Sequence, residues 1–372
     1  MRISALDLKR QIAPIRQELD MAIKDVIDST SFILGKAVNT FEENVMKYCR
    51  VKYAIGVSNG TDAISLALLA LGIKAGDGVI CPAFTYYATA GAIASIGARP
   101  VFADIDSDTY CISLKSIEKV LKNKKKYKIK AIIPVHLYGQ CSDMDGIMKL
   151  ARKYNLKVVE DTAQAFGAEY KGRKAGTIGN CGSVSFFPGK NLGAFGDAGM
   201  ILTNNKAAAE RARILRNQGN KTKYIHLMLG RNNRMDGMQA AALNVKLRYL
   251  DDWNKKRQEL AQYYNNNLSL FAVKTPFVAE YSTHIYHQYV LRIARSRDGM
   301  MNYLQKKGID SRVFYPIPLH LQKCFRYLGY KRGDFPESEK AARQTLTLPI
   351  DPCLTQKERR YISQSLKEFI NG

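Results

Sequence analysis

The sequence has only one tryptophan, five histidines and seven cysteines among its 372 residues. The cysteines form no Cys-x-x-Cys pair, their number is odd, and the histidines lack the spacing of metal ligands. This pattern argues against a disulfide framework and against a zinc site. We therefore expect no bound metal and reduced, buried thiols, as in a cytoplasmic protein.

Acidic residues are also few, with 33 Asp and Glu against 57 Lys and Arg, which gives a net charge of +24. A positive field attracts anions such as nucleic acids or phosphorylated small molecules, although a solvated Lys-rich surface is an alternative. The densest basic run, residues 122–130, lies between a helical pattern and a strand pattern, which predicts a solvated loop. Zinc-finger spacing, a recognisable helix-turn-helix and an RNP aromatic signature are missing, so we expect no nucleic-acid partner.

A signal-peptide core is missing from the first residues, which are charged and polar. Residues 79–98 are uncharged and long enough to span a bilayer. They contain Pro82, Gly91 and Gly97, however, and we interpret them as a strand, a turn and a buried helix. We therefore expect a cytoplasmic protein without a membrane partner.

The first part of the chain alternates short β-branched runs with helical patterns. Strands are predicted at residues 53–57, 78–81, 100–103, 131–135, 157–159, 183–187 and 200–203, and helices at 62–71 and 144–154. Such alternation predicts an α/β protein whose mostly parallel sheet carries helices on both faces. Many of these strands are apolar throughout, as doubly covered strands are.

The pattern changes after about residue 230. Residues 236–268 read as a long helical region with one break. Beyond them, strands are predicted at 288–293 and 311–315 and helices at 297–307 and 356–370. We therefore expect a large α/β domain over residues 1–240 and a smaller C-terminal α+β domain over residues 241–372.

Open parallel sheets bind ligands beyond the carboxyl ends of their strands. After the first strand, Ser-Asn-Gly-Thr-Asp-Ala at 58–63 leads into a helix, whose N-terminal amides form an anion site, with Gly60 allowing close approach. A plain helix cap is the alternative. After the second strand, Phe-Thr-Tyr-Tyr at 84–87 offers an aromatic ring that either stacks on a flat ligand or packs in the core.

Two further strand ends carry charged groups. Glu-Asp-Thr-Ala-Gln at 160–164 offers carboxylates, and an acid beside a pyridine nitrogen would keep that nitrogen protonated. Lys190 follows a Pro-Gly turn among apolar neighbours, where desolvation lowers the pKa of an amine, as a Schiff-base lysine requires, although most loop lysines are solvated. A phosphate site, an aromatic ring, a carboxylate and a lysine on one rim describe a pocket for pyridoxal 5'-phosphate (PLP).

These segments also resemble the DegT/DnrJ/EryC1/StrS family of PLP-dependent sugar-nucleotide aminotransferases. The resemblance extends from about Leu6 to the C-terminus and is carried by residues 58–63, 160–165, 185–193, 196–199, 230–235 and 315–322. It implies PLP-transferase fold type I, which is aspartate aminotransferase-like, with a mostly parallel seven-stranded sheet. It also implies a homodimer with active sites at the interface.

The family pattern implies roles for individual residues. Lys190 would bind the cofactor covalently and move the proton during catalysis, and Asp161 would pair with the pyridine nitrogen. The other residues implied to bind the cofactor ring or its phosphate are Gly60, Thr61, Tyr86, Gln164, Ser185 and, from the other subunit, Asn232. The residues implied to face the sugar nucleotide are Arg234, Tyr315 and His320.

The resemblance implies that L-glutamate converts PLP to pyridoxamine 5'-phosphate, which then aminates a keto-sugar nucleotide for surface polysaccharide or a secondary metabolite. Residues 313–322 favour a 3-keto over a 4-keto sugar. Gln218, Asn233 and Phe314 differ from the residues common in the family near the expected substrate side. The resemblance therefore does not identify the sugar or the nucleotide. The alternatives are another PLP reaction, such as the dehydratase type that has His in place of the lysine, and a non-catalytic PLP-bound regulator.

Overall fold

The fold is built on a seven-stranded sheet. A computed structural model describes residues 1–122, 127–268 and 273–371. The sheet has the strand order β1-β9-β8-β5-β4-β2-β3, and its strands are β1 (Tyr53–Val57), β2 (Gly78–Pro82), β3 (Arg99–Ala103), β4 (Ile129–Ile132), β5 (Lys157–Asp161), β8 (Cys181–Ser185) and β9 (Gly199–Thr203). Only β9 runs antiparallel to its neighbours in this sheet, β1 and β8, so the predicted mostly parallel α/β sheet is confirmed.

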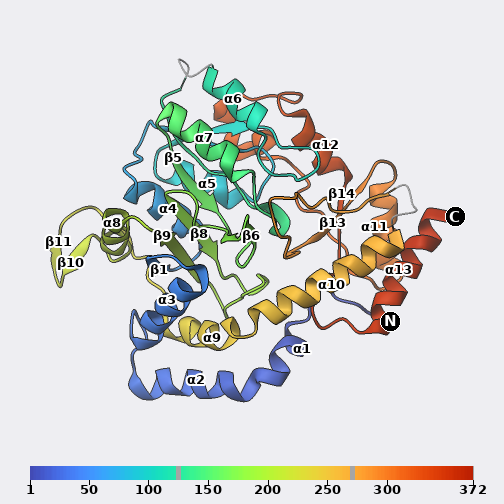
Figure 1. Cartoon of the computed structure of the whole chain (residues 1–372), viewed down its shortest axis with the longest axis horizontal. Coiled ribbons are helices and arrows are strands. Elements are labelled where there is room, and N and C mark those ends of the chain that lie inside the picture. Colours follow the sequence, from blue (N-terminus) through green and yellow to red (C-terminus); the bar gives the residue numbers. More distant parts are fainter. Residues whose placement is uncertain (123–126, 269–272, 372) are drawn as a thin grey trace.

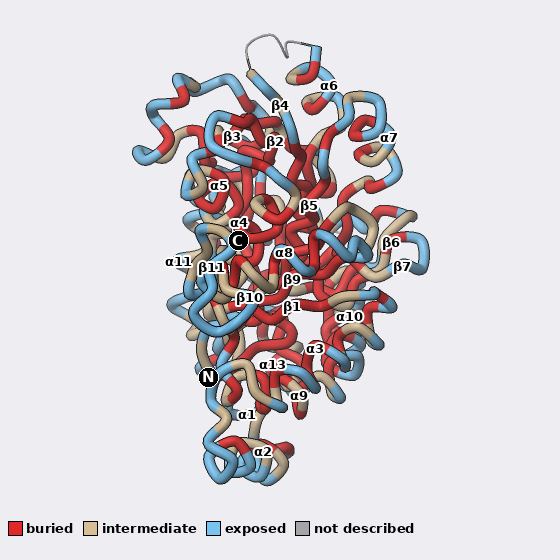
Figure 2. The backbone as a smooth tube through the Cα atoms, turned by 90° about the vertical axis from the view of Figure 1, so that its left-hand side faces the viewer, coloured by how far each residue is buried: buried red, intermediate tan, exposed pale blue. Residues whose placement is uncertain are grey.

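Helices cover both faces of this sheet (Figure 1). They are α3 (Lys36–Cys49), α4 (Gly60–Ala70), α5 (Tyr87–Ser95), α6 (Leu114–Lys122), α7 (Met144–Tyr154) and α8 (Lys206–Arg216). Neighbouring strand residues point to opposite faces, since Val79 packs in the cluster of α4, α5 and α8 while Ile80 packs with α6 and α7. Figure 2 shows the resulting buried centre.

Side-chain caps fix where the helices begin at the sheet edge. The Asn59 side chain accepts a hydrogen bond from the Asp62 amide (2.9 Å), and the Asp143 side chain accepts one from the Gly146 amide (3.1 Å). The first cap places the amino end of α4 directly after β1. This end is therefore aimed at the edge where the parallel strands finish.

The C-terminal part has its own three-stranded antiparallel sheet, formed by β12 (Val273–Lys274), β13 (Tyr289–Ile293) and β14 (Thr345–Leu348). Its helices are α11 (Arg297–Lys306), α12 (Pro336–Gln344) and α13 (Gln356–Asn371), with 3₁₀ turns at Leu319–Leu321 and Lys323–Leu328. Two helices, α9 (Gly237–Leu247) and α10 (Leu250–Leu268), lead into it (Figure 1). The predicted helical region 236–268 therefore has one break, as expected. Residue 240, where we predicted the domain boundary, lies within α9.

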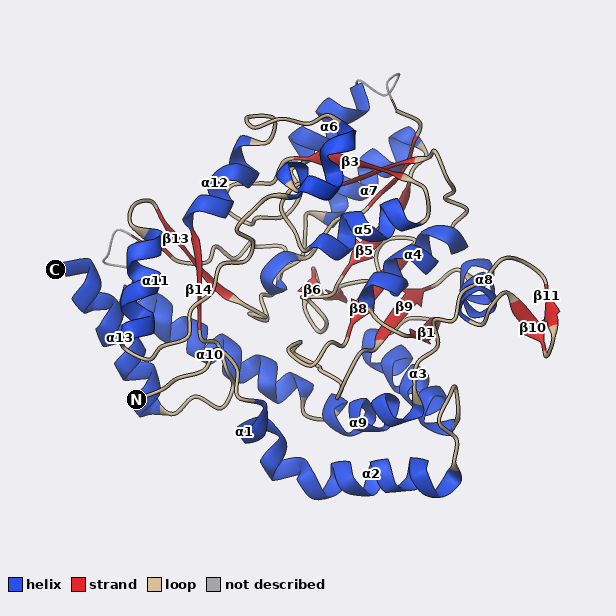
Figure 3. Cartoon of the chain, turned by 180° about the vertical axis from the view of Figure 1, so that it is seen from behind, coloured by secondary structure: helices blue, strands red, loops and turns tan. Residues whose placement is uncertain are grey.

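The N-terminal residues join the C-terminal part. Ile3 pairs with Ile309, and the Asp7 amide donates to Asp351 (2.5 Å). Arg10 pairs with Glu358 at 2.9 Å. The helices α1 (Leu8–Ile12) and α2 (Arg16–Ser29), joined by the 3₁₀ turn Ala13–Ile15, then carry the chain along α9 towards the main sheet (Figure 3).

Three small elements complete the chain: the hairpin of β6 (Glu169–Tyr170) and β7 (Arg173–Lys174), the 3₁₀ turn Leu137–Gly139, and the hairpin of β10 (Asn220–Thr222) and β11 (Ile225–His226). The second hairpin projects from the body of the molecule (Figures 1 and 3). Its neighbourhood carries strongly exposed apolar side chains, among them Leu229, which is 98% exposed.

The predicted strand at 311–315 is wrong. Residues 311–315 make only an isolated bridge, from Arg312 to Thr347, and the strand that pairs with β13 is β14, which sequence patterns missed. Pro316 and Pro318 have no amide hydrogen, so a ladder cannot continue past Tyr315.

The cysteines, the Lys-rich loop and the apolar segments are as follows. All seven cysteines are free, and five are buried as expected, but Cys324 is exposed and Cys353 is partly exposed. The predicted Lys-rich loop lies partly outside the described residues, which omit 123–126. Within the described part of the chain, no helix combines the length and apolar character needed to cross a membrane.

The core of the C-terminal part provides a stability prediction. Leu304 on α11 is fully buried, so Leu304→Ala should lower the free energy of unfolding by about 2–5 kcal/mol through lost burial and a residual cavity. Gln305→Ala, at the exposed neighbouring position, is the matched control and should change it by less than about 0.5 kcal/mol. Equal urea midpoints for the two variants would contradict this packing.

Candidate active site

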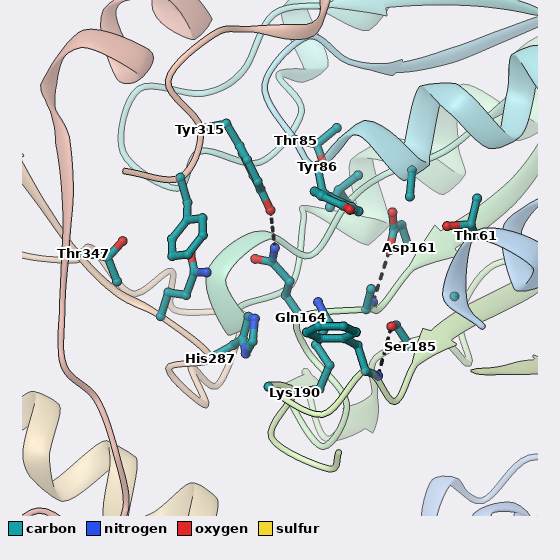
Figure 4. A pocket seen from close by; sticks show the side chains of 18 of the residues that line it. Thr61, Thr85, Tyr86, Asp161, Gln164, Ser185, Lys190, His287, Tyr315 and Thr347 are labelled. Atoms are coloured by element: carbon teal, nitrogen blue, oxygen red, sulfur yellow. Dashed lines mark hydrogen bonds between the residues drawn. The ribbon is translucent and has the colours of Figure 1, made fainter. Parts of the chain in front are cut away.

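A cavity of about 700 Å³ opens at the carboxyl ends of the parallel strands. It is lined by the turns that follow β1, β2, β5 and β8 and by residues of the C-terminal part, including Tyr315 (Figure 4). Most of the predicted site residues line it, namely Gly60, Thr61, Tyr86, Asp161, Gln164, Ser185, Lys190 and Tyr315. Strand ends distant in the sequence therefore meet in one cavity.

The amino end of α4 forms an anion cradle against the end of β8. A Cβ on Gly60 would lie 2.5 Å from Cβ of Ser185, so only glycine permits this approach. Asp62 also lines the cavity, but its Oδ2 accepts hydrogen bonds from Ser58 Oγ (2.5 Å) and Asn59 Nδ2 (2.7 Å). The free amides of the helix start, with Thr61 and Ser185 beside them, can bind a phosphate group.

Asp161 ends β5 and is buried. Its carboxylate accepts hydrogen bonds from Thr89 Oγ1 (2.8 Å) and from the Ala163 amide (3.2 Å). Burial raises the pKa of Asp161, although these hydrogen bonds and the charge of Lys190 oppose the rise. A buried carboxylate of this kind gains most from a cationic partner, such as a protonated ring nitrogen.

Lys190 lies in a tight turn after Pro188 and Gly189, with its amide donating to the Phe187 carbonyl (2.8 Å). Its side chain lines the same cavity as Asp161 (Figure 4). Burial lowers the pKa of Lys190 to about 8, although the negative charge of Asp161 raises it. A larger fraction of this amine than of an ordinary lysine is therefore unprotonated near neutral pH, as a nucleophile or general base requires.

Two aromatic residues and an amide close the other side. Gln164 Nε2 donates to the Tyr315 hydroxyl (2.8 Å), and its Oε1 accepts from the Tyr138 amide (2.8 Å), so the amide has a fixed orientation. The ring of Tyr86 lies 6.0 Å from that of Tyr315, centroid to centroid, with a free face on the cavity (Figure 4). A flat ring can stack on such a face.

The remaining predicted residues lie outside this cavity within one chain. His320, expected to face the sugar, is buried elsewhere: its Nε2 contacts Glu339 Oε1 (3.1 Å) and its ring packs on Phe335. Asn232 is exposed, and Arg234 pairs through its backbone with Val57 at the end of β1. None of the three is among the residues that line the cavity in the described chain.

Sequence patterns missed three residues that the fold brings to this site. Thr89 holds Asp161, and His287 lines the cavity while its Nδ1 contacts Asn191 Oδ1 (3.1 Å). Arg257 lines it from α10, far from any strand end of the main sheet. Only tertiary contacts identify them, since no spacing links these positions to Lys190.

The donor set fits PLP. The cradle at Gly60 suits its phosphate, the free face of Tyr86 suits its ring, Asp161 suits a protonated ring nitrogen, and Lys190 suits a covalent link. The fold and this combination of side chains together define a PLP-dependent aminotransferase of fold type I.

Comparison with known proteins gives the family. The DegT/DnrJ/EryC1/StrS aminotransferase family matches residues 14–367, and the chain belongs to this family. It is therefore a PLP-dependent sugar aminotransferase.

Three relatives illustrate the range of similar proteins. A "Pleiotropic regulatory protein" of Geobacillus stearothermophilus is 45% identical, with 99% of each chain covered. The dTDP-3-amino-3,4,6-trideoxy-alpha-D-glucose transaminase of Streptomyces venezuelae is 39% identical, with 99% of this chain and 96% of the relative covered. A UDP-N-acetyl-3-dehydro-alpha-D-glucosamine 3-aminotransferase of Acidithiobacillus ferrooxidans is also 39% identical, with 100% of this chain and 98% of the relative covered.

A solved structure shows the same fold at full length. The crystal structure of S. venezuelae DesV in complex with a ketimine intermediate superposes with a TM-score of 0.96 at 39% identity. It covers 100% of this chain and 99% of that one.

The lowered pKa of Lys190 can be measured on the cofactor-free protein. We expect acetic anhydride to modify Lys190 with an apparent pKa of about 8, against 10.5 for an ordinary lysine. Asp161→Asn should move the profile to lower pH, because it removes the negative charge that raises this pKa. Mass spectrometry separates Lys190 from the surface lysines, and a profile centred near that of the surface lysines would contradict the burial of this amine.

Proposed function

We propose that this protein transfers an amino group from L-glutamate to the keto group of a nucleotide sugar, with a 3-keto sugar preferred. The observation that carries the proposal is one cavity in which Lys190 and Asp161 face a common space beside the phosphate cradle. The relatives named for 3-amino and 3-dehydro sugars support the choice of position.

The chain's own residues account for the chemistry. Bound PLP supplies an electron sink that stabilises negative charge on the carbon bearing the amino group. Lys190, with a pKa of about 8, would remove a proton from that carbon and return one to the cofactor carbon bonded to the same nitrogen. Asp161 would hold a proton on the ring nitrogen, while Gln164 and Tyr315 order the rim of the cavity.

The test uses the visible spectrum of the purified protein. The yellow band of the bound cofactor should bleach when L-glutamate is added, with stoichiometric 2-oxoglutarate. Lys190→Ala should abolish the band and lower turnover by about 10²- to 10⁴-fold. Gln305→Ala should behave as wild type.

A panel of 3-keto and 4-keto nucleotide sugars then tests the second half of the reaction. We expect higher kcat/KM for a 3-keto sugar. Faster turnover of a 4-keto sugar would reject the positional preference alone. A band that glutamate leaves unchanged would instead reject glutamate as the donor and favour another PLP reaction or the regulatory role suggested by the Geobacillus relative's name.

We also infer a homodimer in which Asn232 reaches the cofactor phosphate of the other subunit. Asn232 is exposed, and the projecting hairpin beside it carries the exposed apolar side chains Tyr224, Ile225, Leu227 and Leu229. An apolar surface of this kind is typical of a protein interface. Asn232 thus lies next to a surface that a second copy of the chain can cover.

Subunit mixing tests this arrangement. Lys190→Ala and Asn232→Ala homodimers should each be weakly active. In a mixed dimer, one site would combine an intact Lys190 with an intact Asn232 from the neighbour, so the mixed dimer should have about half the activity of the wild type and an equal mixture of subunits about a quarter. A monomer in sedimentation, or no recovery on mixing, would contradict the shared site.

A further inference from the structure

Arg257 is a buried cation on the wall of the cavity. Its side chain is 2% exposed, and its Nη1 donates to the carbonyl oxygens of Ile350 (2.6 Å) and Tyr286 (3.4 Å). Its buried Nε has no hydrogen-bond partner, and among the described residues no carboxylate forms an ion pair with it. Arg257 therefore borders the cavity and keeps an unused donor at Nε.

Such a group is unfavourable unless an anion compensates it. Burial lowers the pKa of Arg257 to about 10, although Asp351 opposes this at a distance. The side chain still carries its positive charge at neutral pH. Because a buried charge without a partner costs free energy, a ligand carboxylate would gain a charge-assisted contact with the guanidinium fork here.

The contacts of α10 link this arginine to the reactive lysine. Asn254, one turn before Arg257, accepts a hydrogen bond from Asn191 Nδ2 (2.7 Å), and Asn191 follows Lys190 directly. Burial, and then the charges of Lys190 and Arg257, hold the pKa of His287 well below its usual value. The positive charges of Lys190 and Arg257 therefore both act on the His287 ring, which is uncharged at neutral pH.

This cation is separate from the phosphate cradle. In Figure 4, Thr61 and Ser185 lie on one side of Lys190, and His287 lies on the other. Arg312 also lines the cavity, but its guanidinium already pairs with Asp310 at 2.8 Å. Arg257 is thus the cationic side chain beside His287 that is left without an acidic partner in the described part of the chain.

We propose that Arg257 binds a carboxylate group of the amino donor and so orients the donor amine towards Lys190. The inference rests on the proposed aminotransferase function and assigns its donor subsite. A carboxylate on the sugar is the competing source of the same chemistry. The two half-reactions separate them, because the donor and the sugar react at different times.

The first experiment measures binding without chemistry. Glutarate, which has carboxylates but no amine, is titrated by calorimetry into the PLP-loaded protein and into its Arg257→Lys and Arg257→Gln variants. We expect both substitutions to weaken glutarate binding about 10- to 100-fold, because lysine lacks the fork geometry and glutamine lacks the charge.

The second experiment follows each half-reaction by its spectrum. With L-glutamate alone, the concentration at half-maximal rate should rise by about the same 10- to 100-fold in the variants. With the pyridoxamine form and a keto-sugar nucleotide, the rate should stay within about twofold of the wild type. A purely structural role for Arg257 would lower both half-reactions together.

Arg292→Lys is the matched control. Arg292 is a largely buried arginine of β13 that contacts Gln344 and Glu337 and does not line the cavity. This variant should leave glutarate binding and both half-reactions unchanged. If Arg257→Gln fails to fold, Arg257→Lys keeps the charge in place and decides the question.

Each remaining outcome has one meaning. Unchanged glutarate binding and unchanged donor dependence would overturn the proposal, as would a loss confined to sugar nucleotides that carry a carboxylate. If the wild type reacts with another amino acid but not glutamate, the glutamate proposal fails and Arg257 is tested with that donor. If no amine reacts, the proposed function fails, while glutarate binding still decides the role of Arg257.

Discussion

The pair of adjacent carboxylates at the end of β5 is the constraint on which the site depends. Glu160 is fully buried and receives hydrogen bonds from the amides of Gly176 (2.9 Å), Ile178 (2.7 Å) and Gly179 (2.6 Å), and its Oε2 contacts His136 Nε2 (2.9 Å). Burial alone would raise the pKa of Glu160, but His136 and these amides lower it. Because neighbouring strand residues point to opposite faces, anchoring Glu160 directs Asp161 into the cavity.

The sequence allowed much of this site to be predicted, for reasons that can be stated for particular residues. Asn59 and Gly60 follow one strand of the mostly parallel sheet and Asp161 ends another, and topology alone brings the ends of such strands to one edge. Lys190 could be predicted because the Pro-Gly turn and the apolar residues that point to it lie next to it in the sequence. Periodicity also predicted α7 and one break within residues 236–268, and this break separates α9 from α10.

The rest depends on contacts between distant segments. Arg257 and His287 reach the cavity only because the C-terminal part folds over the strand ends, and nothing near them in the sequence signals that approach. The strand β14 was missed because its partner, β13, lies more than fifty residues earlier. His320 was expected in the cavity, but Glu339 and Phe335 hold its ring elsewhere, which a linear motif does not reveal.

The attachment of the first residues to the C-terminal part has a consequence for the order of assembly. Ile3 forms a β-bridge with Ile309, and Arg10 forms an ion pair with Glu358. Both contacts therefore join residues about three hundred or more positions apart in the sequence. During synthesis, the main sheet can pair its strands while the N-terminal segment still lacks its binding surface. The ion pair from Arg10 to Glu358 cannot form until helix α13 has left the ribosome, and long-range closure of this kind is slow. The part of the cavity wall that Ala5 and Leu6 provide is therefore completed late in folding.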